Sequence, residues 1–236
     1  MFRDTLTKAN IIRELFDTFN QQLEKAKLIT RAGTIVDATF IEAPRQQNNQ
    51  EEKDDIKQGK IPEEWKKPEN IHKLRQKDTD ARWTRKGNQL HYGYKNHVKA
   101  DAESKLIVDY AVTDASVHDS KVICGLLDGK DKVLYADSAY WGKPVEEGLP
   151  ETVENRIHER GTKKQPLSEE QKANNRIKAK TRARIEHIFG FMTMSMHGLT
   201  VRSIGMARTE FNVGLTNLIY NLYRYEFLNR PKETVG

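Results

Sequence analysis

The sequence predicts an α/β domain in which a mixed β-sheet is flanked by helices. Short apolar runs typical of buried strands alternate with longer segments whose apolar residues recur at helical spacing. With 236 residues, 36% of them hydrophobic, the chain is long enough for one large domain with its own core. A charged fraction of 31% and a net charge of +6 leave a large polar surface whose basic balance suits a polyanionic partner.

An N-terminal helical segment is predicted over residues 1–30, because apolar residues recur there on one helical face. The first strand follows from Thr34 to about Ile41, and Pro44 marks its exit. Residues 45–89 then form a polar insertion after the first strand, with little apolar material to support a core. We expect this insertion to be a loop or partly disordered.

A hairpin is predicted after the insertion, where the pattern changes to a period of two. Residues 91–100 alternate well enough for an edge or half-exposed strand, and residues 106–113 form the next strand. A helix then runs to Leu127, with Asp119 or Ser116 as its cap.

The last part of the chain is mainly helical. Residues 132–137 form another strand, and residues 153–158 form a last, short one. The helices that follow carry two apolar stripes, one at Ile185, Ile188, Phe189, Met192 and Met196 and one at Leu215, Leu218, Ile219 and Leu222. Residues 230–236 form a short tail, which leaves residues 31–229 as the main domain.

Two classes of protein are excluded or disfavoured by composition. The single cysteine, Cys124, rules out a disulfide framework or a cysteine zinc site within one chain. No apolar run is long enough to cross a bilayer, and the N-terminus lacks the apolar core of a signal peptide. The sequence therefore predicts a cytoplasmic protein with no membrane partner.

Three acidic residues carry most of the functional information. Asp37 and Asp137 each interrupt a short apolar run that reads as a buried strand, and Glu186 lies on a strongly helical segment. A carboxylate inside a strand is costly to bury unless something neutralises it, and Mg²⁺ favours carboxylate ligands. Two strand carboxylates and one helix carboxylate are what a two-metal phosphoryl-transfer site requires, provided that the two strands are neighbours.

The helix around Glu186 permits two interpretations. Arg182 and Glu186 are four residues apart and share a helical face, so Arg182 could orient Glu186 or contact a phosphate. The same spacing also describes an ordinary surface ion pair. Asp119, which follows His118, is read as a helix cap rather than a ligand, and the histidines show no zinc spacing.

A second group of residues suggests contact with nucleic acid. Residues 82–86 mix a tryptophan with three cations, which could bind phosphates while the indole stacks on a base. A solvated loop is an equally good interpretation of this segment. The candidate DNA contacts, in falling order, are Arg82, Trp83, Arg85, Lys86, Lys95 and His97.

Taken together, these residues resemble the DDE transposases of the insertion-sequence-five group. The segments that carry the resemblance occur in the expected order and are residues 33–39, 77–83, 91–97, 113–120, 136–140 and 182–190. The resemblance implies an RNase H-like transposase catalytic domain over residues 31–229. It implies Mg²⁺ or Mn²⁺ held by Asp37, Asp137 and Glu186, with strand cleavage at transposon ends and transfer to target DNA.

The resemblance also implies a setting and partners. Transposon ends and target sites make double-stranded DNA the main partner, a homo-oligomer is expected, and the location would be the bacterial nucleoid. Group members usually carry an additional N-terminal helical DNA-binding segment, whereas this chain begins 36 residues before Asp37. We therefore expect a truncated reading frame or a catalytic half that works with a separate DNA-binding polypeptide.

Two positions depart from the group's signature around the third acid. The signature has a Tyr before the Arg and a Lys after the Glu, and these positions are Ala179 and Thr193 here. The missing Lys is expected to touch DNA near the cleavage site. Two rival hypotheses follow: a DNA-binding remnant that regulates transposition without cleaving, and an assembly subunit that pairs through the stripe from Leu215 to Leu222.

Overall fold

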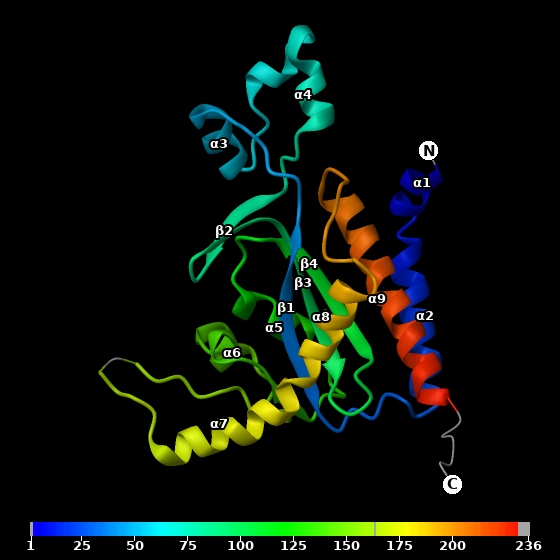
Figure 1. Ribbon diagram of the computed structural model, residues 1–236, viewed down its shortest axis with the longest axis vertical. Coiled ribbons are helices and arrows are strands. Elements are labelled where there is room, and N and C mark those ends of the chain that lie inside the picture. The colour runs from blue at the N-terminus through cyan, green and yellow to red at the C-terminus, as the bar shows by residue number, and fades with distance from the viewer. Residues whose placement is uncertain (1, 163, 231–236) are drawn as a thin grey trace.

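The structure, a computed structural model, describes residues 2–162 and 164–230. A mixed sheet of six strands forms its centre, in the order β2-β3-β1-β5-β6, with β4 also paired to β3 (Figure 1). Strands β1, β3, β2 and β4 pair antiparallel, whereas β5 runs parallel to both β1 and β6. The strands are β1 (Thr34–Glu42), β2 (Arg82–Lys86), β3 (Gln89–Asp101), β4 (Ile107–Asp114), β5 (Val133–Tyr135) and β6 (Glu154–Asn155).

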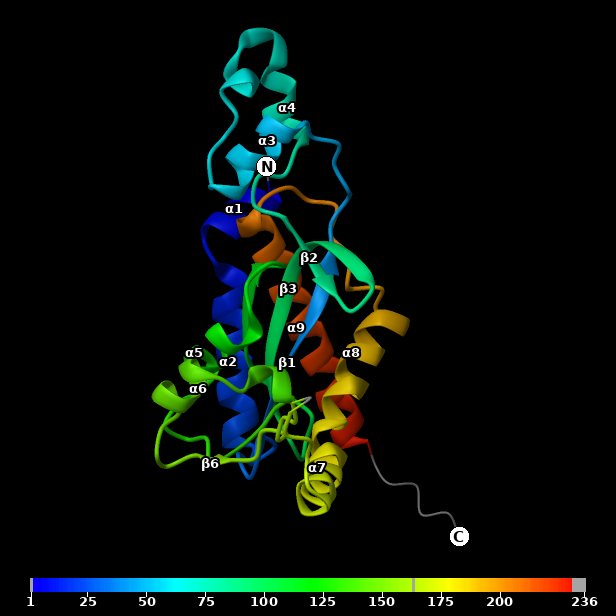
Figure 2. The same ribbon diagram turned by 90° about the vertical axis from the view of Figure 1, so that its left-hand side faces the viewer.

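Helices cover both faces of the sheet, so the expected α/β arrangement is observed. One face packs against α2 (Ile11–Lys25), α8 (Arg184–Met194) and α9 (Met206–Asn229) through a core that includes Ile35 and Val98. The other face packs against α5 (Ile123–Leu126) and α6 (Lys143–Gly148) around Val36. Ile35 and Val36 are adjacent, so the alternation of a strand divides the two cores. Figure 2 shows α5 and α6 on the side of the sheet away from α8.

The N-terminal helical segment is two helices rather than one. Helix α1 (Phe2–Lys8) is separated from α2 by a turn in which Asn10 has φ 51°, the left-handed conformation that Asn tolerates. The second helix ends at Lys25, before the predicted limit, and Lys27 again has a positive φ of 58°. Periodicity alone could not place these two breaks.

The prediction that residues 45–89 are a loop or partly disordered is wrong, because helices and 3₁₀ turns form there. The segment contains α3 (Gln50–Lys57), two 3₁₀ turns, η1 (Glu63–Lys66) and η2 (Pro68–Asn70), and α4 (Ile71–Gln76), which project together from the sheet (Figure 1). Trp65 is fully buried here, and its Nε1–H donates to Glu52 Oε1 at 2.6 Å. The side chain of Trp65 thus forms the centre of a small core, which the polar composition of the segment did not indicate.

The strand predicted at the sheet edge is instead central. Strand β3 pairs with β1 on one side and, along residues 94–100, with β4 on the other. Residues 92–101 are all buried. Residues 82–86, read as a loop, form the edge strand β2. The helix expected after Ser116 is a 3₁₀ turn, η3 (Asp119–Lys121), followed by α5, and His118 accepts the capping hydrogen bond from Ser120 N–H.

The apolar stripe predicted on the last helix is not its buried face. In α9 the buried positions include Thr209, Val213, Asn217 and Asn221, whereas Leu222 is 47% exposed. The asparagines tolerate burial because their amides are paired: Asn221 accepts from Ile107 N–H and donates to Ile107 C=O, both at 2.8 Å. Of the predicted tail at 230–236, residues 231–236 lie outside the described residues.

Candidate active site

Strand pairing brings two of the three predicted acids together. β1 and β5 run parallel with Thr34 opposite Leu134 and Ile35 opposite Tyr135, and the same register places Asp37 beside Asp137. Asp37 lies within β1, and its Oδ1 accepts from Ala38 N–H at 2.8 Å. Asp137 lies just past the end of β5, where its Oδ1 accepts from Ser138 N–H at 2.6 Å and caps the turn η4 (Ser138–Tyr140).

Arg182 links the third acid to this pair. It is the last residue of α7 (Glu169–Arg182), and Ala183 separates it from α8, which carries Glu186. The Arg182 Nη1 lies 3.3 Å from Asp37 Oδ2, and its Nη2 lies 3.1 Å from Glu186 Oε1. The ordinary i,i+4 pair is therefore present, but the same guanidinium also reaches a strand carboxylate 145 residues away.

The electrostatics of Asp37 reflect its position. Burial raises the pKa of its carboxyl above the usual value, and the neighbouring Asp137 raises it further. The Ala38 N–H and the cations of Arg182 and Lys86 oppose this shift. Two adjacent carboxylates, one of them poorly solvated, form a site that gains from a bound cation.

Carboxylate oxygens are the right donors for Mg²⁺ or Mn²⁺, but they do not all converge. Among the described residues, no group of three Asp, Glu, His or Cys side chains lies close enough to hold a metal ion. Asp37 and Asp137 lie side by side, whereas Glu186 is 63% exposed and paired with Arg182. The guanidinium thus provides the positive charge between Asp37 and Glu186 in this conformation.

His158 Nε2 and Arg182 Nε are buried near the acids and have no hydrogen-bond partner among the described residues, and the Tyr140 hydroxyl is buried beside Asp37. Burial raises the pKa of Tyr140 well above its usual value, and the carboxylates of Asp37, Asp119 and Asp137 raise it further, so the hydroxyl faces the acids. Burial and Arg182 lower the pKa of His158, while Asp137 opposes them. Buried groups without partners mark a site that a ligand can complete.

Tyr140 and His158 were not predicted as site residues. Tyr140 belongs to the segment 136–140 that carries the resemblance, and its position three residues after Asp137 is one turn of a 3₁₀ helix. That spacing could have indicated that the Tyr140 side chain lies close to Asp137. No local pattern marks His158, since it reaches the site through its backbone bond to Ala136 C=O at 3.1 Å.

A groove of about 240 Å³ adjoins the acids on the side of β2. Its cations include the exposed Arg85 and Lys86 of the edge strand, which were both predicted DNA contacts. It is lined by Ala38, Thr39, Phe40, Thr84, Arg85, Lys86, Lys95, Ser116, Val117, His118, Asp119 and Ala139.

The remaining predicted DNA contacts differ in access. Trp83 is 44% exposed, with the Arg45 guanidinium 5.6 Å from its ring centre, whereas Arg82 donates to the carbonyls of Thr79 and Ala81. The Lys95 ammonium bonds to Asp119 Oδ1 at 2.8 Å.

His97 is fully buried, and its Nε2 lies 2.8 Å from Thr113 Oγ1. Burial lowers the pKa of His97 to about 4, so its ring is neutral near pH 7. The structure therefore places His97 out of reach of DNA.

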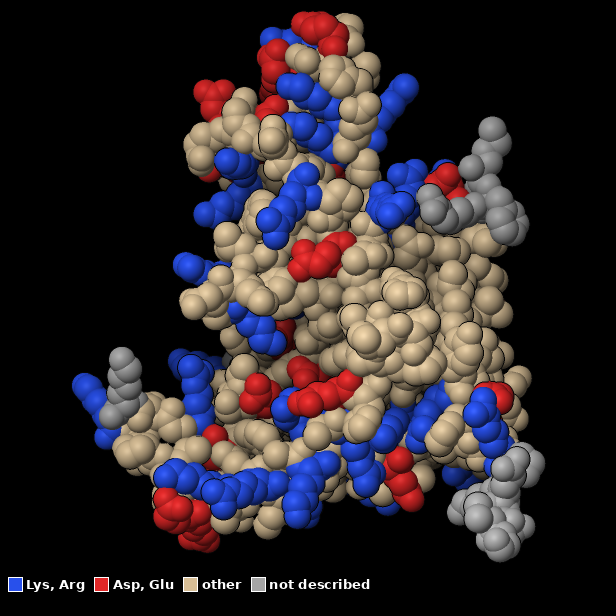
Figure 3. Space-filling view, in the orientation of Figure 1, with Lys and Arg blue, Asp and Glu red and all other residues tan. Residues whose placement is uncertain are grey.

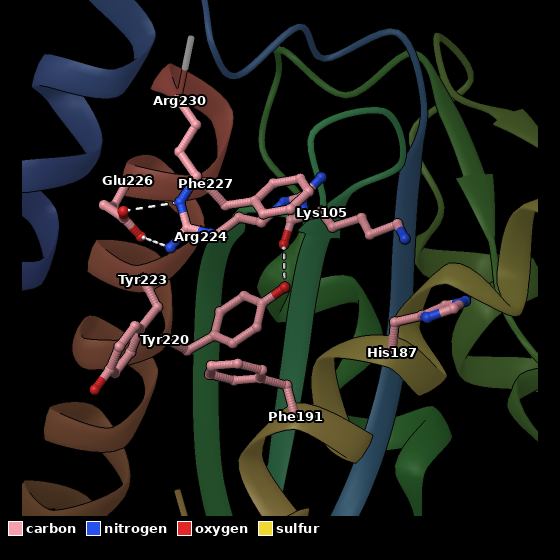
Figure 4. Close-up of a pocket in the computed structure, with 9 residues that line it drawn as sticks. All are labelled: Lys105, His187, Phe191, Tyr220, Tyr223, Arg224, Glu226, Phe227 and Arg230. Atoms are coloured by element: carbon pink, nitrogen blue, oxygen red, sulfur yellow. Dashed lines mark hydrogen bonds and ion pairs between the residues drawn. The ribbon is translucent and has the colours of Figure 1, made fainter. Parts of the chain in front are cut away.

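A separate pocket of about 400 Å³ lies between α8 and α9 (Figure 4). Its lining is aromatic and cationic, and its one carboxylate, Glu226, is paired with Arg230. It therefore offers no cluster of acids. The lining residues are Lys105, His187, Phe191, Tyr220, Tyr223, Arg224, Glu226, Phe227 and Arg230.

The mixed sheet thus carries acids on two neighbouring strands, and an arginine joins one of them to a helix glutamate. The family model for the transposase DDE domain matches residues 30–222. The chain therefore belongs to the transposase DDE domain family.

The cryo-EM structure of a piggyBac transposase synaptic complex with hairpin DNA is similar with a TM-score of 0.43 and 9% sequence identity. The similarity covers 86% of this chain and 49% of that one, so this chain spans about half of that protein's length. Among residues 2–162 and 164–230, no helix is both long and apolar enough to cross a membrane.

Proposed function

We propose that this chain is an RNase H-like catalytic domain of a transposase of the insertion-sequence-five group. It would cut and join DNA strands at insertion-sequence ends and in target DNA. The observation that carries this proposal is that Asp37 and Asp137 lie side by side on neighbouring strands, while Arg182 links Asp37 to Glu186. Double-stranded DNA is the substrate, and a homo-oligomer brings two ends together.

Asp37 and Asp137, with Glu186, would hold Mg²⁺ or Mn²⁺. When bound, such a cation stabilises the attacking and leaving oxygens of an in-line displacement at phosphorus. Arg182 orients Glu186 toward Asp37 and is the cation best placed to contact the reacting phosphate. The Tyr140 hydroxyl, which faces the acids, can donate a hydrogen bond to Asp37 or to substrate.

A second candidate function is a regulatory DNA-binding remnant that does not cleave. It is favoured by the absence of a three-ligand cluster among the described residues and by Thr193 at the position of the group's Lys. The Thr193 hydroxyl donates to Phe189 C=O at 2.8 Å, so it is committed to its own helix.

The test compares Mn²⁺ binding by calorimetry with nicking of supercoiled plasmid. The wild type is measured beside Asp137→Asn, because Asn can keep the cap on η4 while it removes the charge. Glu151→Ala, which removes an exposed carboxylate elsewhere, is the matched control. We expect binding and nicking in the wild type and the control, and loss of both in Asp137→Asn. If the wild type binds no Mn²⁺, the enzyme hypothesis is rejected in favour of the regulatory DNA-binding remnant.

A further inference from the structure

Helix α7 is fastened to the body by polar contacts on its inner side. Asn175 Nδ2 donates to Glu159 C=O at 3.0 Å and its Oδ1 accepts from Glu159 N–H at 2.9 Å. Lys178 Nζ donates to Ile157 C=O at 3.0 Å, and Arg182 reaches Asp37. None of the residues Glu169–Arg182, all of which the structure describes, is buried. Hydrophobic packing therefore does not explain the composition of this helix.

The outer side of α7 carries a row of cations: Lys172, Arg176 and Lys180. They recur every four residues, so they share one face and rise about 6 Å from one to the next. All three are exposed; Lys172 pairs with Glu169, whereas Arg176 and Lys180 have no acidic partner among the described residues. Like charges at this spacing destabilise a helix, so a negatively charged partner would relieve their repulsion.

The position of this row relates it to the acids. Its C-terminal end, Lys180, is two residues from Arg182, which contacts Asp37 and Glu186, so the row begins beside the candidate active site. From there the 14 residues of α7 extend outward by about 21 Å. In Figure 3, Lys and Arg side chains follow α7 along the lower edge of the molecule, and others gather around β2.

We propose that Lys172, Arg176 and Lys180 bind the phosphate backbone of duplex DNA as it leaves the acid site. This inference rests on the proposed function, since it takes DNA as the substrate, and it adds a second contact surface to the one on β2. The contacts are to phosphates, so they position the duplex without reading its sequence.

The experiment measures binding of a fluorescent duplex of arbitrary sequence by anisotropy, with EDTA present, from about 50 to about 200 mM KCl. The triple variant Lys172→Ala, Arg176→Ala, Lys180→Ala should fold, because alanine favours a helix that buries nothing. The matched control is Lys53→Ala, Lys57→Ala, Lys60→Ala, which removes the same charge from exposed sites in the projecting segment around α3.

We expect the slope of log affinity against log salt to fall by about 2 to 3 in the α7 variant, at roughly 0.9 per phosphate contact. The control should retain the wild-type slope. An unchanged slope in the α7 variant, an equal loss in both variants, or a wild type that binds no duplex would each overturn the proposal. If DNA binding depends on α7 but the wild type does not nick plasmid, the α7 proposal stands and the proposed transposase activity is rejected.

Discussion

At the scale of single residues, the acid site combines burial with incomplete pairing. Asp37 has one ion partner, Arg182, and a carboxylate neighbour, Asp137, and burial is the largest influence on its pKa. Tyr140 adds a buried hydroxyl beside Asp37, and His158 adds a buried nitrogen with no hydrogen-bond partner among the described residues. A site arranged for a ligand in this way lowers the stability of the folded protein.

Asp37→Asn should therefore stabilise the protein near neutral pH. The folded-state pKa of Asp37 lies above the ordinary value of 3.8, so the wild type loses stability as the pH rises from 3.8 through the folded-state pKa. Asparagine removes that penalty and keeps an oxygen for the Ala38 N–H. Thermal unfolding should show a Tm a few degrees higher at pH 7 and a smaller difference near pH 4. A lower Tm at pH 7 would mean that the Arg182 ion pair outweighs burial.

The sequence marks Asp37, Asp137 and Glu186 as candidate acids, but it does not indicate which residues surround them. Asp37, Asp137 and Glu186 are recognisable because a carboxylate is unusual in an apolar strand and because the helix spacing is readable. The bridge from Arg182 to Asp37 depends on tertiary packing, and so does the burial of His97. An alternating pattern does not distinguish a strand at the sheet edge from one at its centre. For this reason His97 was predicted to contact DNA although it is buried.

At the scale of elements, the segment 77–83 fastens the helical insertion to the domain. Asp78 is buried, and its carboxylate accepts from the Tyr94 hydroxyl at 2.7 Å, from Ala81 N–H and from Gly205 N–H. Asp80 Oδ2 accepts from Met206 N–H at 2.7 Å and so caps α9. Both acids of this segment therefore have structural roles beside the exposed Trp83.

Asp80→Ala should lower stability by about 1 kcal/mol, the usual cost of losing a helix cap. For a chain of this size, that corresponds to a fall in Tm of about 2–4 °C. Asp80→Asn keeps an oxygen acceptor and should retain most of the stability, as measured by denaturant unfolding. Equal losses in the two variants would show that the charge of Asp80, rather than its hydrogen bond to Met206, stabilises the start of α9.

Element identity was more predictable than element burial. The strands around Asp37 and Asp137 were recognisable from their apolar runs, because β-branched and aliphatic residues concentrate there. The predicted burial was wrong in α9, where Asn217 and Asn221 are buried and Leu222 is exposed. A polar side chain can be buried when it pairs with a backbone group that has no other partner. Ile107 of β4 provides such a group, because its N–H donates to Asn221.

At the scale of the whole molecule, a buried charge network joins segments that are distant in sequence. Lys99 of β3 is 1% exposed, and its ammonium lies 2.8 Å from Asp131 and 3.1 Å from Asp128, both in the turn before β5. Asp131 also accepts from Thr34 of β1 at 2.7 Å, and Arg31 lies 3.6 Å away. The network holds β1, β3 and β5 in the order that aligns Asp37 with Asp137.

Asp131→Asn should cost about 3–5 kcal/mol, because it leaves much of the buried Lys99 charge uncompensated. Asp128→Asn is the matched control: it removes a carboxylate from the same ammonium, but that carboxylate is 44% exposed and should cost about 1 kcal/mol or less. Denaturant unfolding of both variants measures the difference. Similar losses would show that Asp131 contributes no more than a surface partner does.

The helical segment between β1 and β2 can change in length during evolution at little cost to the rest of the domain. The chain leaves the sheet near Arg45 and returns at Trp83, and these two side chains lie against each other. Because the ends are already closed by the sheet, doubling the length between them costs only about 0.6 kcal/mol of loop entropy. Evolution can therefore lengthen, shorten or exchange this segment without disturbing the alignment of Asp37 with Asp137.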